Sequence, residues 1–103
     1  MSEDVKEAVD ALLRLPRAPT QLKVLFYLLE SGRSMTIKEM AERLGMTRKA
    51  VERAVYKLHK KGLVERSRYM EGHYRCSIRK MVTYLIAACT ELRKSLEELS
   101  EKG

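Results

Sequence analysis

Cationic and hydroxyl side chains between Thr47 and Lys57 fall at positions that share one face of a helix. The inward positions of that helix are apolar and recur with helical spacing, at Ala50, Val51, Ala54, Val55 and Leu58. The outward positions are Thr47, Arg48, Lys49, Glu52, Arg53, Tyr56 and Lys57. Arginine can donate two hydrogen bonds to guanine, threonine can reach a phosphate or a thymine methyl, and lysine neutralises phosphate. The predicted chemistry is contact with the major groove of duplex DNA.

Glu52 is the acidic member of this outward face. A carboxylate near phosphates is repelled unless it has a partner. Three roles are open for it: it accepts a hydrogen bond from cytosine, it orients Arg48 or Arg53, or it forms an ion pair within its own helix.

A second set of cationic side chains follows on two predicted strands, Leu63 to Arg68 and His73 to Ile78, which join around Glu71-Gly72. This hairpin carries Arg66, Arg68 and Arg75, and arginine is favoured in the negative potential of the minor groove. We predict that these three arginines contact DNA on its backbone or in its minor groove. His73 is expected to be a polar loop residue. Arg33 and Lys38 are further candidates for phosphate contacts.

The charge of the chain is concentrated in its middle. Of 21 Lys and Arg residues, 14 lie in residues 33–80, with five of the 14 Asp and Glu residues, so this segment has a net charge of +9 and the whole chain one of +7. A basic face flanked by near-neutral segments is typical of a nucleic-acid-binding protein, but the charge by itself equally fits a solvated basic surface with no partner.

Other functional classes lack their signatures. The sequence has no paired carboxylates, no nucleophile beside a base, no glycine-rich phosphate loop and no metal-ligand spacing, so we expect no enzyme, metal or cofactor. Cys76 and Cys89 are expected to be apolar fillers. No apolar run is long enough for a membrane span, and the acidic start lacks the basic region of a secretory signal. The expectation is a cytoplasmic protein without membrane contact.

Helices and one hairpin must position these side chains. Helical periodicity and end signals predict helices from Ser2 to Leu15, from Thr20 to Glu30, after the Thr36-x-x-Glu39 capping box as far as Gly45, after Thr47 as far as Gly62, and from Arg79 to Ser100. The second helix is expected to be central and buried, because Leu22, Leu25, Phe26, Leu28 and Leu29 cover more than one face. The fold class is mainly α with a small β-hairpin (α+β): a winged helix-turn-helix with N- and C-terminal dimerisation helices.

The helix-turn-helix needs a small residue where the two helices cross, a glycine in the turn and apolar inner positions. Ala41, Gly45 and Val51 supply these, and Met40, Leu44, Met46, Ala54 and Val55 surround them. The segment 36–58, followed by 60–66, resembles winged-helix regulators of the TrmB and MarR type. The resemblance covers residues 19 to 80 and implies DNA binding through the second helix of the motif and the wing, with dimerisation through the terminal helices.

The last predicted helix has an apolar seam with heptad spacing. The seam consists of Val82, Leu85, Cys89, Leu92, Leu96 and Leu99. Such a narrow stripe favours a partner helix, and we predict a two-fold homodimer. The alternative is that the seam packs within its own chain, against the first helix.

We therefore expect a sequence-specific, homodimeric transcriptional regulator that binds double-stranded DNA. The expected organisation is an N-terminal helix (1–16), a winged helix-turn-helix domain (17–80) and a C-terminal dimerisation helix (81–103). The alternatives are a non-specific, chromatin-type DNA binder and a winged-helix protein-interaction module. The sequence leaves open whether a small-molecule effector binds.

Overall fold

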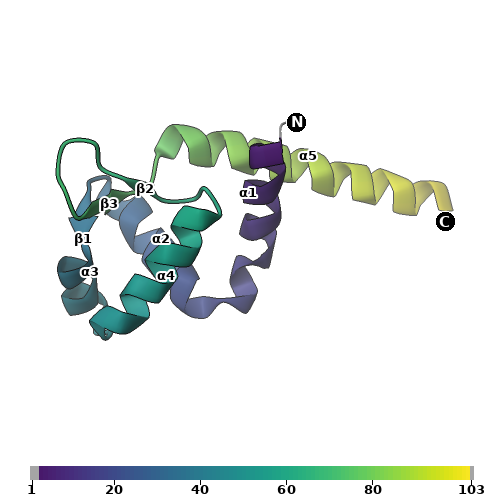
Figure 1. Cartoon of the computed structure of the whole chain (residues 1–103). Coiled ribbons are helices and arrows are strands. Elements are labelled where there is room, and N and C mark those ends of the chain that lie inside the picture. The colour runs from purple at the N-terminus through teal and green to yellow at the C-terminus, as the bar shows by residue number, and fades with distance from the viewer. Residues whose placement is uncertain (1–2, 103) are drawn as a thin grey trace.

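The computed structural model describes residues 3–102 as a helical body from which one long helix projects (Figure 1). The helices are α1 (Glu3–Arg14), α2 (Pro19–Ser31), α3 (Ile37–Leu44), α4 (Arg48–Lys60) and α5 (Ile78–Lys102), with one 3₁₀ turn, η1 (Leu15–Arg17). The strands are β1 (Met35–Thr36), β2 (Glu65–Arg66) and β3 (His73–Arg75). Helices account for 74% of the structure, which confirms the predicted mainly helical class. Ser2, the predicted start of the first helix, lies outside the described residues.

Local side-chain hydrogen bonds set where α3 and α4 begin. The Glu39 amide donates to Thr36 Oγ1 at 3.1 Å, and the Thr36 amide donates to Glu39 Oε1 at 3.4 Å, which confirms the predicted capping box. The Ala50 amide donates to Thr47 Oγ1 at 3.1 Å at the start of α4. Between the two helices Gly45 has a φ of +64°, a conformation that costs glycine little. These caps fix the turn that aims α4.

The core lies where α2, α3 and α4 meet. Val24 and Leu28 of α2, Met40 of α3, and Val51 and Leu58 of α4 are fully buried. Lys61, just after α4, donates from Nζ to Oε1 of the buried Gln21 of α2 at 2.8 Å. Burying one face of α4 in this way forces its other face outward.

One expectation for α2 is wrong. Phe26 was expected in a buried, central helix, but half of its surface is exposed, whereas its neighbours Val24, Leu25 and Leu28 are buried. Because a helix turns by 100° at each residue, consecutive apolar residues cannot all face the same core. The apolar run of α2 therefore exceeds what its core contact can cover.

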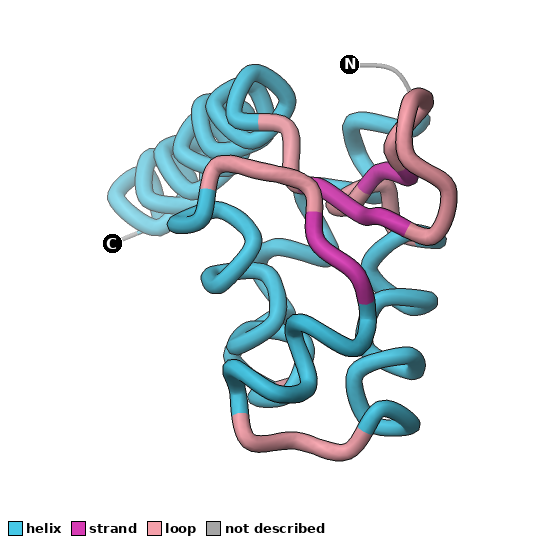
Figure 2. Tube along the Cα trace, turned by 90° about the vertical axis from the view of Figure 1, so that its left-hand side faces the viewer, coloured by secondary structure: helices cyan, strands magenta, loops and turns pink. Residues whose placement is uncertain are grey.

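The wing is a three-stranded antiparallel sheet in the order β1-β3-β2 (Figure 2). Met35 pairs with Tyr74, and Glu65 pairs with Arg75. The hairpin is confirmed, but both strands are shorter than predicted. Leu63 and Val64 are both buried and do not alternate. Ile78 is 58% exposed and begins α5, so its expected place at the end of the second strand is wrong. The sequence reasoning missed β1, which is two residues long.

Helix α5 packs against α1 in its middle part and then continues beyond the body (Figure 1). Its buried side chains are Met81, Tyr84 and Ala88, and the Tyr84 hydroxyl donates to the Gly62 carbonyl at 3.4 Å. These residues form a different stripe of the helix from the predicted seam. The chain therefore does pack its first and last helices together, as the alternative supposed, but the heptad seam remains exposed.

Candidate nucleic-acid interface

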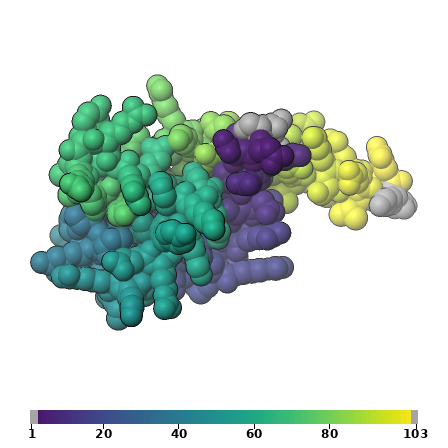
Figure 3. All heavy atoms as spheres, viewed as in Figure 1, coloured from purple at the N-terminus to yellow at the C-terminus, as the bar shows by residue number. Residues whose placement is uncertain are grey.

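The outer face of α4 carries the seven residues predicted from the spacing, and all seven are exposed. They are Thr47, Arg48, Lys49, Glu52, Arg53, Tyr56 and Lys57. The burial of Val51, Ala54, Val55 and Leu58 on the opposite side is the physical cause. In Figure 3 the side chains of α4, in teal, stand on the face turned to the viewer.

The cations of this face have no acidic partner in residues 3–102. Arg48, Lys49, Arg53 and Lys57 take part in none of the ion pairs that the structure describes, and neither does Glu52. Four positive charges on one helix face repel one another unless an anion lies nearby. We call this cluster, Arg48, Lys49, Arg53 and Lys57, the α4 cation face. Its geometry suits a polyanionic surface.

The wing arginines are in two different states. Arg66 and Arg68 are exposed and make no ion pair within the described part of the chain. Arg75 instead donates from Nε and Nη2 to Glu65 Oε2 at 3.3 and 3.2 Å. Lys80 of α5 binds the other oxygen of the same carboxylate. The Arg75 guanidinium is thus already engaged by its own sheet, which separates it from Arg66 and Arg68.

Glu65 is the electrostatic centre of the wing. The hydrogen bond from Lys80, aided by Arg75, lowers the pKa of its carboxyl group below the usual value, although partial burial acts in the opposite direction. The same contact raises the pKa of Lys80. Glu65 therefore holds β2, β3 and the start of α5 together as a charged cluster.

The tip of the wing is held by backbone and hydroxyl contacts. Ser67 Oγ accepts hydrogen bonds from the amides of Tyr69 and Met70 at 3.3 and 3.2 Å. Tyr69 is 94% exposed at this tip. His73 contacts the Glu71 carbonyl through Nδ1 at 3.1 Å, which fits its expected role as a loop residue. The arrangement presents Arg68 and Tyr69 to the surroundings of the protein.

The two further candidates for phosphate contact also differ. Arg33 donates from Nη1 to Glu39 Oε2 at 3.3 Å, so it is tied to the capping box of α3. Together with the Thr36 amide, this contact lowers the pKa of Glu39. Lys38 is exposed on α3 and takes part in no ion pair that the structure describes. Lys38 is thus the freer of the two cations.

Sequence reasoning missed basic residues that the fold adds to the wing. Arg79 and Lys80, in the first turn of α5, line a hollow of about 590 Å³ together with wing residues. The one sequence feature that could have identified them is their position at the end of the basic segment 33–80. Because they were assigned to the terminal helix, their proximity to Arg66 and Arg68 was not foreseen.

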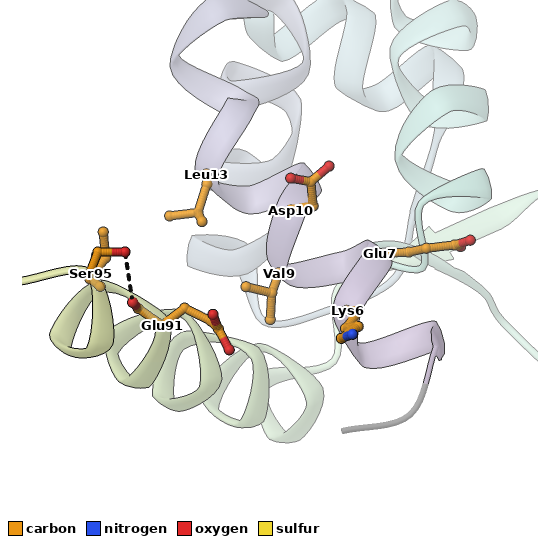
Figure 4. A pocket seen from close by; sticks show the side chains of 8 residues that line it. Lys6, Glu7, Val9, Asp10, Leu13, Glu91 and Ser95 are labelled. Atoms are coloured by element: carbon orange, nitrogen blue, oxygen red, sulfur yellow. Dashed lines mark hydrogen bonds between the residues drawn. The ribbon is translucent and has the colours of Figure 1, made fainter. Parts of the chain in front are cut away.

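A second hollow, of about 530 Å³, lies between α1 and α5 (Figure 4). Val9 and Leu13 line it from α1, and Glu91 and Ser95 line it from α5. Leu92, a member of the predicted seam, also borders it. The seam is therefore continuous with a partly apolar groove beside α1.

No group of His, Cys, Asp and Glu side chains within residues 3–102 could hold a metal ion. Burial, with a smaller effect of Glu65, raises the pKa of the Cys76 thiol to about 11, so this thiol stays protonated at neutral pH. Among the described helices, none has the length and apolar character for a membrane span.

Three helices, a glycine turn and a small wing define a winged helix-turn-helix regulator. The sequence profile of the MarR family matches residues 15–68, just over half of the chain. The chain belongs to the MarR family. The resemblance seen in the sequence is thereby confirmed for its MarR part. No curated protein sequence matches the chain.

Solved structures share this fold at low sequence identity. The ST1889 protein from the archaeon Sulfolobus tokodaii is 24% identical, with a TM-score of 0.59, over 75% of this chain and 81% of its own. The YusO protein from Bacillus subtilis is 21% identical, with a TM-score of 0.57, over 97% of this chain and 75% of its own. The ORF112 Zα domain of Cyprinid herpesvirus 3, which binds Z-DNA, is 23% identical with a TM-score of 0.53, over 58% of this chain and 95% of its own.

Proposed function

We propose that this MarR-family protein is a sequence-specific regulator that binds double-stranded DNA as a homodimer. The observation that carries the proposal is the α4 cation face, which is exposed and lacks acidic partners within residues 3–102. In this proposal α4 enters the major groove, where Arg48 and Arg53 read base edges and Lys49 and Lys57 contact phosphates. Thr47, Glu52 and Tyr56 complete the contact surface.

The wing extends the contact along the DNA. Arg66 and Arg68 lie on the backbone or in the minor groove, where the negative potential favours arginine. Arg75 contacts DNA only if it exchanges its bonds to Glu65 for bonds to phosphate. Its contribution is therefore expected to be the smallest of the three.

The exposed seam of α5 supports the homodimer. The large apolar side chains of the seam, Val82, Leu85, Leu92, Leu96 and Leu99, are between 49% and 68% exposed. Burial of a leucine stabilises an assembly by about 1.5–3 kcal/mol relative to exposure. A second copy of the chain offers the same seam, and two-fold pairing covers both at once. In this arrangement the groove beside α1 receives part of the partner's helix.

Dimerisation would also increase sequence specificity, because it places two copies of α4 on the same DNA. A two-fold dimer whose recognition helices lie about 34 Å apart can read two half-sites one turn of DNA apart. The proposal therefore predicts an inverted repeat in the preferred DNA.

The decisive experiment selects bound sequences from a random duplex pool at a fixed salt concentration between about 50 and 200 mM. Enrichment of an inverted repeat with half-sites one helical turn apart supports the proposal. Equal affinity for all duplexes identifies a non-specific, chromatin-type binder instead. If the protein binds no duplex even at low salt, the alternative of a protein-interaction module is favoured. Light scattering on the free protein tests the dimer independently of DNA.

A further inference from the structure

The outer face of the wing sheet forms a hollow that the DNA contacts of α4 do not use. Glu65 and Arg75 are directly opposite in the β2–β3 pairing, so their side chains share one face of the sheet. The first turn of α5 closes one side of the hollow and the wing loop closes another. Figure 1 shows these two segments at the same end of the molecule, away from the C-terminus.

The hollow has a surplus of positive charge. Its cationic lining residues are Arg66, Arg68, Arg75, Arg79 and Lys80. Glu65 is the acidic residue that lines it, and its carboxylate is already bound by Arg75 and Lys80. Arg66, Arg68 and Arg79 are left without an ion pair within the described residues. Three arginines without an ion pair therefore line one hollow, and a bound anion would reduce the repulsion between their positive charges.

The remaining lining groups fit phosphate oxygens. Ser34, Ser67 and Ser77 also line the hollow; the hydroxyl oxygens of Ser67 and Ser77 already accept backbone hydrogen bonds, which leaves their hydroxyl hydrogens to donate. Guanidinium groups bind phosphate through paired, charge-assisted hydrogen bonds, and hydroxyl groups can add single bonds. Tyr69 is the aromatic residue of the lining and offers a ring to an organic substituent. More of the lining is polar than apolar, so the hollow suits a charged ligand better than an uncharged apolar one.

We propose that this hollow binds a small, multiply charged phosphate compound, such as a phosphate ester. Its volume of about 590 Å³ lies in the range of small-ligand sites. A DNA backbone phosphate offers the same chemistry from another source. The small anion is favoured because the groups line a concave hollow, whereas a duplex presents a convex surface that reaches only the rim. The proposal does not depend on dimerisation, but it shares Arg66 and Arg68 with the wing contact proposed for DNA, so DNA and the small anion would compete for these two arginines.

The test uses the full chain and inorganic pyrophosphate as the probe. Amide resonances are followed in ¹⁵N–¹H spectra while pyrophosphate replaces sodium chloride at constant ionic strength. Saturable shifts are expected at Ser34, Ser67, Ser77 and Arg79, around the hollow. Arg79→Gln should weaken binding by about threefold to tenfold, because one charge-assisted contact is lost. Arg79 is exposed, and glutamine has a similar helix propensity, so the fold should persist.

Arg93→Gln is the matched control, because Arg93 is an exposed arginine on the same helix and does not line the hollow. The proposal predicts that this control binds pyrophosphate like the unmodified protein. Shifts that rise without saturation, or that weaken equally in both variants, would show general ionic screening and overturn the proposal. It is also overturned if a DNA duplex shifts these resonances and pyrophosphate does not, because the hollow is then a backbone contact.

Discussion

Helices α4 and α5 are both amphipathic, but they use their apolar faces differently. In α4 the apolar stripe is buried inside the chain at Val51, Ala54, Val55 and Leu58, although Ala50 is only partly buried, and the outward face is cationic. In α5 a short stripe with Met81, Tyr84 and Ala88 faces the body, while the longer heptad seam is exposed. One helix therefore presents charge to its surroundings and the other presents leucines. The two outward faces suit different partners, a polyanion and an apolar surface.

The difference shows what periodicity alone cannot decide. A helical repeat of apolar residues predicts that one face of the helix will be buried. It does not predict whether that face packs within the same chain or against a partner. Only the packing in the structure reveals that α4 buries its apolar stripe within the chain and that α5 leaves an apolar stripe exposed. The following predictions test whether the two faces are as independent as this comparison implies.

The largest effect is expected for substitutions in the α5 seam, which should change the oligomeric state. Leu96→Asp combined with Leu99→Asp should convert the proposed dimer to a monomer. Both leucines are about two thirds exposed in the single chain. A dimer contains four of them, and each buried leucine contributes about 1.5–3 kcal/mol. Light scattering should report half the mass, while circular dichroism should report an unchanged helix content.

Thr83→Asp combined with Thr90→Asp is the control for charge. Both threonines are exposed on α5, do not belong to the seam, and receive the same added charge. This variant should retain the mass of the unmodified protein. If the seam variant retains it too, the leucines of α5 do not form the dimer, and the proposed contrast with α4 fails.

The second-largest effect is expected for a buried residue of α4, whose substitution should lower stability. Leu58 is fully buried, so Leu58→Ala should lower the free energy of unfolding by about 2–5 kcal/mol. Denaturant titration measures this loss. The matched substitution Leu99→Ala, at a concentration where the chain is monomeric, should change stability by less than about 1 kcal/mol, because Leu99 is exposed. Equal losses would mean that the two apolar stripes are not different.

The sequence predicted the helix-turn-helix well because its signals are local. Thr36 with Glu39, Thr47 and Gly45 act through neighbours within four residues, and the structure shows each of these contacts or conformations. The outward placing of Arg48 and Arg53 followed from the same local rule.

The wing was predicted less well because its contacts are not local. Strand β1 is two residues long and exists through its pairing with β3, almost 40 positions later in the chain. The ion pairs of Glu65 with Arg75 and Lys80 likewise depend on the hairpin and on the start of α5. Short strands have little periodicity, and no pattern in the sequence announces which charges a hairpin will bring together.

On the charged side of the comparison, Arg53→Ala tests whether α4 reads bases. If Arg53 contacts a base, the substitution should cost about 1–3 kcal/mol of binding at one position of the site and relax the preference there. Affinities for a set of single-base variants of the selected duplex measure this. A uniform loss across all duplexes identifies a phosphate contact. Arg93→Ala, at an exposed position of α5, is the control and should leave affinity nearly unchanged.

The smallest effect, a small loss of stability, is expected at Glu65, where the wing meets the start of α5. Glu65→Gln removes the carboxylate that Arg75 and Lys80 share. Both partners are more than half exposed, so the loss of stability at neutral pH should be only about 0.5–1 kcal/mol. The folded state lowers the pKa of Glu65, so its contribution is present above the unfolded-state pKa and disappears as the pH falls through the lower, folded-state value. Denaturant titrations across this range should show the two proteins converging in acid. A difference that persists in acid would mean that Glu65 acts through packing, and that its charge does not hold the wing to α5.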